Sequence, residues 1–269
     1  MPPVGRRSLG EFIPVNVLIV FAHPEPKSFN GALRDVAIDT LRAADHQVEI
    51  SDLYAMSFKA VADADDFVVR ADSDYLRIDR EQTAAHESGT TSADIRTEQD
   101  KVERADLIIL QFPLWWFGPP AILKGWFDRV FTRGFGYRAG CKYDTGLMRG
   151  KLAMVSVTTG TSADTYAPDG IDGEILDILW PVHNGLLRYT GFDVLAPNIV
   201  HMPGRISGTE RETALQQYAF RLQNLNDQPT LFFHPSSDYG PDERLLAHVT
   251  PASGFQHRAN QLAPSRQDG

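Results

Sequence analysis

Residues 111–129 carry the strongest fold signal in the chain and read Gln-Phe-Pro-Leu-Trp-Trp-Phe-Gly-Pro-Pro-Ala-Ile-Leu-Lys-Gly-Trp-Phe-Asp-Arg. They directly follow the apolar run Asp106–Leu110, so a buried strand is predicted to end near Phe112 and a short aromatic loop to lead into a helix. Ligands of open α/β sheets bind at the carboxyl ends of strands. The three aromatic side chains and two prolines of this loop form a stiff, flat-walled slot. Such a slot suits a planar cofactor ring better than a phosphate or a nucleic acid.

Strands and helices are predicted to alternate along the chain. The strands are Asn16–Ala22, Gln47–Ser51, Asp106–Phe112, Lys151–Thr158 and Phe192–Ile199. The helices run from Ser28 or Asn30 to about Ala43, over Ile122–Thr132, over most of Asp172–Tyr189 with a break at Pro181, and over Thr209–Leu225 with Thr209 and Glu212 as a capping box. This alternation predicts a three-layer α/β fold with a doubly wound parallel sheet of five strands, in the flavodoxin-like order 2-1-3-4-5.

The chain of 269 residues is long enough for one α/β domain with extensions. We expect the cofactor-binding domain to cover residues 15–225. Residues 1–14 are expected to be a disordered leader, because they have two arginines but no long apolar stretch typical of a signal peptide. The acidic insert at 54–92 and the tail at 226–269 exceed a minimal domain, and each is either a solvated decoration or an interface.

Composition argues against several classes of protein and site. The net charge of −9 disfavours binding to nucleic acids or anionic membranes, and no apolar run is long enough to span a membrane. The single cysteine, Cys141, forms no internal disulfide and fits a reducing, cytoplasmic environment. Because no Cys/His pair has ligand spacing, no metal site is expected.

The loop after the first strand, His23–Asn30, is predicted to receive an anionic group at the N-terminus of the following helix. Ser28 and Asn30 offer side-chain donors, and Lys27 offers a cation. The loop is neither a Walker A nor a Gly-x-Gly-x-x-Gly sequence, which argues against an ATPase and against a nicotinamide-binding Rossmann site. Taken alone, His23 would be an ordinary polar loop residue, but its neighbours favour a ligand role.

A turn rich in threonine and glycine follows the fourth strand. It reads Thr158-Thr159-Gly160-Thr161-Ser162 and precedes Tyr166 and Asp172. Such a turn presents N–H groups and hydroxyls toward one point, as the polar edge of a flavin requires. Tyr166 could donate its phenol proton to a ring that carries negative charge. The alternative interpretation is a surface turn with a half-buried tyrosine.

In these segments the chain resembles the NAD(P)H:quinone oxidoreductase family of the DT-diaphorase type. The resemblance runs from about Asn16 to Leu225. Its matching segments are 22–23, 28–30, 51–56, 111–114, 116–118, 120–127, 158–160 with Tyr166, 178–181 and 191–192. No single match identifies the family, but so many matches in the same order do.

The resemblance implies a flavodoxin-like fold, tightly bound FAD and a homodimer with each active site at the subunit interface. It implies ping-pong transfer of two electrons as hydride from NADPH or NADH to flavin, and then to a quinone-like acceptor. By position, the flavin phosphates and ribityl chain would be held by His23, Ser28, Phe29 and Asn30, and the adenine-side phosphates by Arg211. The isoalloxazine would contact Pro113, Leu114, Trp115, Trp116 and Phe117. The polar edge of the ring would be bound by Thr158, Thr159, Gly160 and Thr161. Tyr166 and Asp172 would be catalytic, and Tyr166 would also contact the flavin. Substrate would meet Trp116, Phe117 and Arg205, with Tyr137 supplied by the partner subunit.

Three positions depart from the family pattern. Asp172, within Gly170-Ile171-Asp172-Gly173, stands where the family has a relay histidine, and an ionised aspartate would oppose charge gained by the flavin. Asp172 is therefore protonated, or it only orients Tyr166, or the reaction relies on backbone donors. Ala139 replaces a second tyrosine that caps the pocket, which predicts a wider pocket. Arg205 falls about where a pocket histidine would lie, which favours an anionic acceptor.

Two other functions stay open at this point. The chain could be a regulatory flavin- or dinucleotide-binding subunit, as some relatives are in potassium-efflux systems. It could also be a biosynthetic tailoring reductase with a bulky substrate. FMN is a second candidate cofactor, and the sequence identifies neither the preferred nicotinamide donor nor the physiological acceptor.

Overall fold

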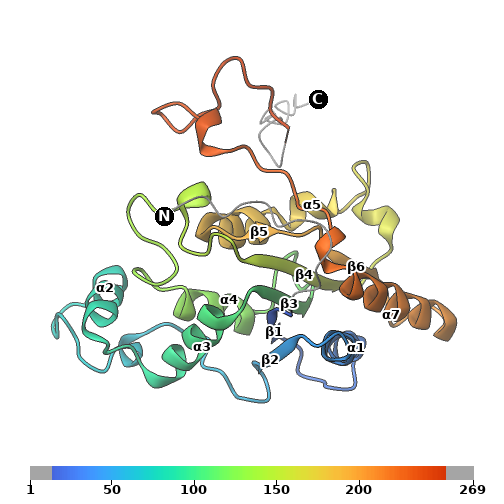
Figure 1. The fold of residues 1–269 in the computed structure, drawn as a ribbon, viewed down its shortest axis with the longest axis horizontal. Coiled ribbons are helices and arrows are strands. Elements are labelled where there is room, and N and C mark those ends of the chain that lie inside the picture. Colours follow the sequence, from blue (N-terminus) through green and yellow to red (C-terminus); the bar gives the residue numbers. More distant parts are fainter. Residues whose placement is uncertain (1–13, 253–269) are drawn as a thin grey trace, which may run out of the picture.

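The computed structural model describes residues 14–252 and shows a six-stranded parallel sheet between two layers of helices (Figure 1). The strands are β1 (Asn16–Phe21), β2 (Gln47–Asp52), β3 (Leu107–Pro113), β4 (Leu152–Thr159), β5 (Asp193–Val194) and β6 (Asn198–His201). Their order is β2-β1-β3-β4-β5, and β6 also pairs with β4. The predicted flavodoxin-like fold and strand order are therefore confirmed.

The predicted single strand Phe192–Ile199 is wrong, because the chain forms two short strands there. β5 and β6 both pair with β4, and the segment 195–197 separates them. Pro197 has no N–H to donate to a ladder, and the N–H of Ala196 donates instead to the carbonyl of Pro229 at 2.9 Å. The second strand, β6, pairs His201 with Thr159 at the carboxyl end of the sheet.

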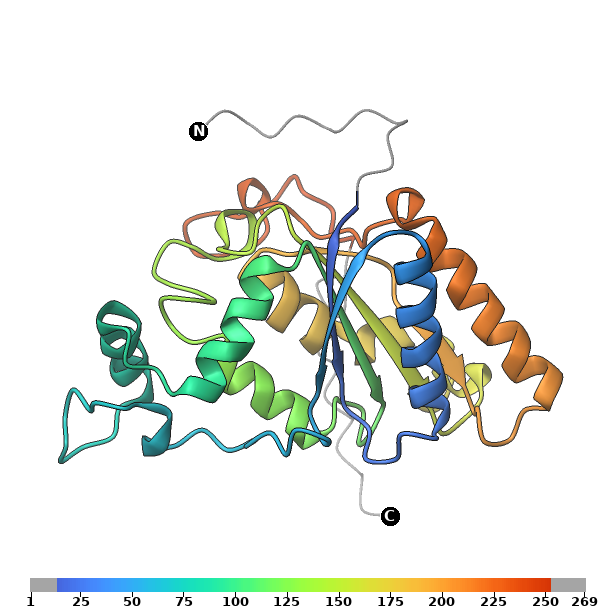
Figure 2. The same cartoon turned by 60° about the horizontal axis from the view of Figure 1, so that its bottom comes forward.

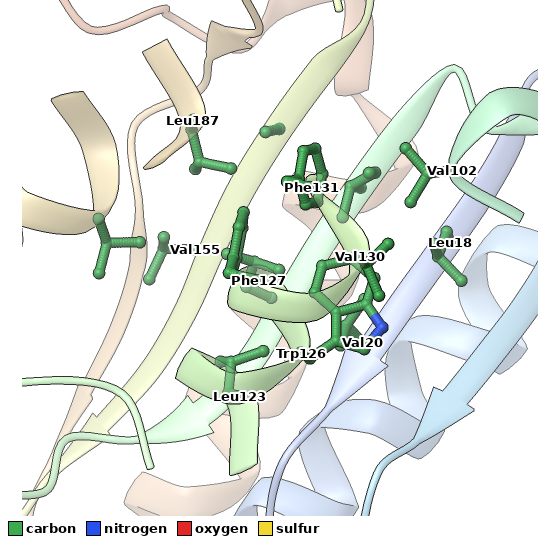
Figure 3. Packing of buried hydrophobic residues seen from close by; sticks show 14 of the residues in the cluster. Leu18, Val20, Val102, Leu123, Trp126, Phe127, Val130, Phe131, Val155 and Leu187 are labelled. Atoms are coloured by element: carbon green, nitrogen blue, oxygen red, sulfur yellow. The ribbon is translucent and has the colours of Figure 1, made fainter. Parts of the chain in front are cut away.

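Two pairs of helices cover the two faces of the sheet (Figure 2). α1 (Phe29–Ala43) and α7 (Gly208–Gln223) lie on one face, and α3 (Ala93–Arg104) and α4 (Ala121–Val130) lie on the other. Alternate residues of β1 point to opposite faces of the sheet. Val17 and Ile19 pack with α1 and α7, whereas Leu18 and Val20 pack with α4. Figure 3 shows Trp126 of α4 beside Val20. Burial on both faces explains why these strands read as continuous apolar runs.

The ends of the helices differ in detail from the sequence predictions. Ser28 caps α1 by accepting a hydrogen bond from the N–H of Gly31, so the side chain of Asn30 is left for another role. The capping box of α7 is Ser207 with Glu210, not Thr209 with Glu212. Ser207 has the extended backbone that a cap needs, with φ −65° and ψ 166°.

The segment predicted as a helix over Asp172–Tyr189 is broken into short pieces. They are α5 (Ile175–Ile178), α6 (Trp180–Val182) and a π-helical segment, η4 (His183–Arg188). The predicted break is observed where Pro181 enters the first turn of α6. Proline is tolerated in that first turn because the N–H it lacks would have no partner within the helix.

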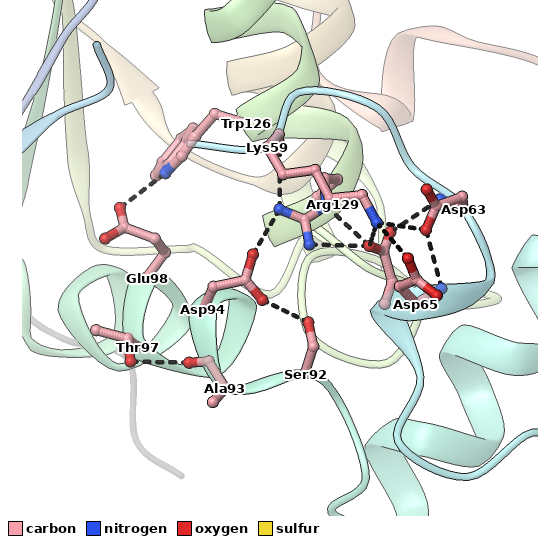
Figure 4. Close-up of polar contacts among 11 residues, drawn as sticks. Lys59, Asp63, Asp65, Ser92, Ala93, Asp94, Thr97, Glu98, Trp126 and Arg129 are labelled. Atoms are coloured by element: carbon pink, nitrogen blue, oxygen red, sulfur yellow. Dashed lines mark hydrogen bonds and ion pairs between the residues drawn. The ribbon is translucent and has the colours of Figure 1, made fainter. Parts of the chain in front are cut away.

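The insert at 54–92 has more structure than its polar composition suggests. It contains the short helix η1 (Ala64–Asp66) and α2 (Ile78–Ser88). Arg129 of α4 is only 1% exposed, and it pairs with Asp66 at 2.8 Å and with Asp94 of α3 at 2.7 Å. Lys59 pairs with Asp63 beside this cluster (Figure 4). Arg129 therefore ties the insert to the two helices of this layer.

The described part of the tail completes one edge of the sheet. The N–H of Leu231 donates to the carbonyl of Val194 in β5 at 2.7 Å, and Thr230 forms an antiparallel bridge with Leu195. Leu231 and Phe233 pack against the apolar core. The predicted leader, apart from Pro14, and residues 253–269 of the tail lie outside the described residues. Within residues 14–252, no helix has the length and apolar character needed to cross a membrane.

Candidate active site

A cavity of about 550 Å³ opens at the carboxyl ends of β1, β3 and β4. Its wall comes from the two loops singled out in the sequence, the turn after β4 and the segment after β6. It consists of His23, Lys27, Ser28, Phe29, Asn30, Ala32, Pro113, Leu114, Trp115, Thr158, Thr159, Gly160, Pro203, Gly204 and Arg211. The structure thus brings together most of the residues predicted to hold a cofactor, although they are far apart in sequence. Pro203 and Gly204 were not predicted, and their only signal is a Pro-Gly turn after the last strand.

Three buried polar side chains are hydrogen-bonded in a row at this cavity, and two of them, Asn30 and Thr158, belong to its wall. The amide of Asn30 donates to the hydroxyl of Thr158 at 2.8 Å, and the amide of Gln111 donates to the carbonyl oxygen of Asn30 at 2.8 Å. Because Thr158 accepts from Asn30, its own hydroxyl proton is available to the cavity. Gln111 was not predicted as a site residue, and its signal is a polar side chain in an otherwise apolar strand.

One end of the cavity is suited to anions. The first turn of α1 presents backbone N–H groups there, with the positive end of the helix dipole. Lys27 adds a cation, and so does Arg211, whose guanidinium donates to the carbonyl of Ile206 at 2.7 Å. The loop before α1 packs so closely that a Cβ at Gly31 would lie 1.9 Å from the carbonyl oxygen of Pro26. This end of the cavity is therefore positively charged and tightly built.

The aromatic loop after β3 is a tight turn. The backbones of Trp115 and Gly118 exchange two hydrogen bonds of 3.0 and 3.1 Å, and Trp116 and Phe117 between them have φ values of 51° and 57°. Such left-handed backbone favours Asn or Gly and costs non-glycine residues about 1–2 kcal/mol each. Trp115 lines the cavity, whereas Trp116 is 98% exposed and Phe117 is 52% exposed. The predicted contribution of Trp116 and Phe117 to the flavin slot is not seen in the cavity wall.

The segment after β4 holds the two predicted catalytic residues. Thr161 is exposed at its start, and its hydroxyl donates to the carboxylate of Asp172 at 3.3 Å. Tyr166 is buried, and its ring stacks on that of His201, with the centroids 5.7 Å apart. The cavity wall contains Thr158, Thr159 and Gly160 of this segment. It does not contain the residues that follow them in sequence, Thr161, Tyr166 and Asp172.

The two remaining predicted substrate residues lie elsewhere. Tyr137 lines a second cavity of about 500 Å³ with Tyr189 and Asp79 of α2. Burial raises the pKa of the Tyr137 phenol. Arg205 is exposed on the turn after β6 and lies outside both cavities. The structure of one chain therefore does not bring Tyr137 or Arg205 to the first cavity.

Comparison with known proteins agrees with this geometry. A family model described as the flavodoxin-like fold matches residues 15–225. NAD(P)H dehydrogenase (quinone) 1 of Cavia porcellus is 43% identical over 221 residues, which are 82% of this chain and 80% of that protein. The chain belongs to the NAD(P)H:quinone oxidoreductase family. It is therefore an oxidoreductase.

Two further relatives of this family cover the chain to a similar or greater extent. Ribosyldihydronicotinamide dehydrogenase (quinone) of Homo sapiens is 45% identical over 210 residues, 78% of this chain and 91% of that protein. A solved structure from Klebsiella pneumoniae, assigned as a quinone reductase, superposes with a TM-score of 0.86 at 40% identity. It covers 91% of this chain and 100% of its own. The family assignment thus rests on sequence and on the whole fold.

Proposed function

We propose that this protein is an FAD-dependent NAD(P)H dehydrogenase that reduces a quinone-like acceptor. In the overall reaction, NAD(P)H, a proton and a quinone give NAD(P)⁺ and a hydroquinone. Two electrons pass as hydride in two half-reactions, so the nicotinamide leaves before the acceptor enters. A bound flavin supplies this chemistry because it takes up hydride from one partner and delivers it to the next.

One observation carries this proposal: a single cavity has neutral donors at one end and cations at the other. Thr158, Thr159 and Gly160 supply hydroxyl and backbone donors suited to the polar edge of a flavin ring. Pro113, Leu114 and Trp115 supply the apolar wall against which a planar ring packs. Within residues 14–252, no three His, Cys, Asp or Glu side chains gather as a metal site.

The far end of the cavity supports FAD over FMN. The first turn of α1 and Lys27 provide for one phosphate, and the wall also contains a second cation, Arg211, with the turn at Pro203 and Gly204. FMN has a single phosphate and would leave this second cationic position unused. A dinucleotide uses both positions.

A homodimer is part of the proposal, because the chain exposes large apolar side chains around the site. Trp116 is 98% exposed and Ile171 is 93% exposed. In this proposal a second copy covers them and, as the family resemblance implies, supplies its Tyr137 to the active site. The single cysteine supports a cytoplasmic location.

The test is the identity of the bound cofactor together with turnover. The purified protein is expected to be yellow, to release FAD on heating, and to oxidise NADPH or NADH rapidly with menadione as acceptor. Double-reciprocal plots of the initial rate against NAD(P)H, at several fixed menadione concentrations, should give parallel lines if the ping-pong scheme holds. A colourless protein that binds neither FAD nor FMN in calorimetry would refute the proposal. Tight nucleotide binding with negligible turnover would instead support a regulatory subunit.

A further inference from the structure

An imidazole lies beside Tyr166, and it belongs to His201 of β6. The two rings stack with their centroids 5.7 Å apart and an interplanar angle of 29°. His201 is the last residue of β6 and pairs with Thr159 of β4 in the parallel ladder. The sheet therefore fixes the position of this imidazole.

His201 also holds the turn that lines the cavity. Its Nδ1 lies 2.9 Å from Oγ1 of Thr159. The hydroxyl of Thr159 donates to the carbonyl of Thr161 at 2.9 Å, so its oxygen is left to accept from Nδ1–H of His201. This arrangement places a proton on Nδ1 of His201. Burial lowers the pKa of His201, although a hydrogen bond to the Thr161 backbone opposes this, and the ring is therefore neutral at pH 7.

Asp172 also contacts the Thr159–Thr161 turn. Its carboxylate accepts from the hydroxyl of Thr161 at 3.3 Å, and that hydroxyl accepts from Thr165 at 2.9 Å. Within residues 14–252, no hydrogen bond joins Asp172 to Tyr166. The aspartate at the family's histidine position therefore holds the turn, whereas the ring that contacts the tyrosine comes from a different strand.

We infer that His201 is the positioning residue that sets both Tyr166 and the Thr159–Thr161 turn for the reaction, in place of an imidazole at position 172. The inference rests on the proposed function, because Thr159 and Gly160 line the cavity proposed for the flavin. Stacked rings exchange no proton with each other. His201 thus acts through Tyr166 and Thr159 and is not itself a catalytic residue.

Two substitutions separate the two contacts of His201. His201→Asn keeps an N–H donor near the place of Nδ1 but removes the stacked ring. His201→Phe keeps a ring but removes the donor. Tyr166→Phe and the double variant Tyr166→Phe/His201→Asn complete a double-mutant cycle. His248→Asn is the matched control, because His248 is exposed on the tail.

The first readout is the rate of flavin reduction by NADPH in stopped flow, with the limiting rate separated from the nucleotide affinity. His201→Asn is expected to lower the limiting rate about 10- to 100-fold, the usual cost of misplacing a reacting group, at unchanged nucleotide affinity. In the Tyr166→Phe background the same change is expected to have no further effect. A limiting rate within twofold of the unmodified protein, or effects that multiply in the double variant, would overturn the inference.

The second readout is flavin binding, which needs no turnover. His201→Phe is expected to weaken FAD binding at least fivefold and to shift the flavin absorbance bands, because the Thr159–Thr161 turn loses its support. If the unmodified protein binds FAD but is not reduced, the proposed function fails while this readout still tests the inference. Unchanged affinity and unchanged bands in His201→Phe would contradict it.

Discussion

Asn30 and Thr158 are 128 residues apart in the chain, yet the amide of Asn30 donates a 2.8 Å hydrogen bond to the hydroxyl of Thr158. This contact joins the first turn of α1 to the end of β4 in the wall of the cavity. The amide of Gln111 in β3 donates to the carbonyl oxygen of Asn30, so hydrogen bonds connect α1 to both β3 and β4. The donors of the cavity are therefore held in place by the fold and need no ligand to order them.

Replacing Asn30 by alanine is expected to weaken both the fold and FAD binding. The amide of Gln111 and the hydroxyl of Thr158 would lose their buried partner, which costs about 1–3 kcal/mol of unfolding free energy. Urea denaturation of the apoprotein and FAD titration measure the two effects. Asn198→Ala is the control, because Asn198 makes a similar 2.9 Å hydrogen bond to Ser156 away from the cavity wall. Equal losses of FAD affinity in both variants would contradict the role given to Asn30.

Arg129→Met is expected to be strongly destabilising. It removes the arginine partner of Asp66, which is 3% exposed, and leaves only Lys59 at 3.5 Å to pair with this carboxylate. Breaking a buried pair costs up to about 3–5 kcal/mol. Lys124→Met is the control in the same helix, since its ion pair with Asp128 is solvent-exposed and is worth at most about 0.5 kcal/mol. Both values come from urea unfolding curves. Similar midpoints for the two variants would show that Arg129 does not anchor the insert.

His183 gives the fold a specific pH dependence. Burial lowers the pKa of His183 to about 4 from its ordinary 6.5, so the folded protein keeps the ring neutral where the unfolded chain would protonate it. Stability from this group is therefore complete above pH 6.5 and is lost as the pH falls toward 4, by roughly 3 kcal/mol in all. His183→Gln should remove this slope in unfolding free energy between pH 6.5 and 4. His248→Gln, at an exposed position, should retain it.

The two adjacent tryptophans of the aromatic loop are expected to have different roles. Trp115→Ala should weaken FAD binding, because Trp115 forms part of the cavity wall and lies 6.3 Å from the ring of His23. Trp116→Ala should leave unfolding of the single chain nearly unchanged but weaken dimerisation by about 1–3 kcal/mol, the value of burying one large apolar side chain. Calorimetry measures the loss of FAD affinity in Trp115→Ala, and sedimentation measures the loss of dimer affinity in Trp116→Ala. A dimer of undiminished affinity in Trp116→Ala would place the interface elsewhere.

The sequence predicted the parts of the molecule that depend on local pattern. The apolar run before Gln111 and the polar loops at His23 and Thr158 identified the strands and the carboxyl edge where the cavity lies. A sheet of known topology brings those strand ends together, so the cavity wall followed from strand order. The break at Pro197 was missed because the surrounding residues keep a strand-like pattern.

Other features depend on contacts between distant segments and left no local signal. The stacking of His201 on Tyr166 requires the register of β6 on β4, which is set only after the break. Arg129 is a charged residue on a helix, and nothing nearby in sequence indicates that its partner Asp66 lies in the insert. The outward position of Trp116 follows from two left-handed residues that sequence preferences disfavour.

The hydrogen bonds from Ala196 and Leu231 at the edge of β5 have a consequence for handling the protein. They pair the carbonyl of Val194 and the N–H of Ala196, which would otherwise be free to bond to a neighbouring chain. A shortened version that stopped near residue 225 would uncover this edge together with apolar surface now beneath Leu231 and Phe233. We expect such a fragment to aggregate, even though it contains the whole cavity wall.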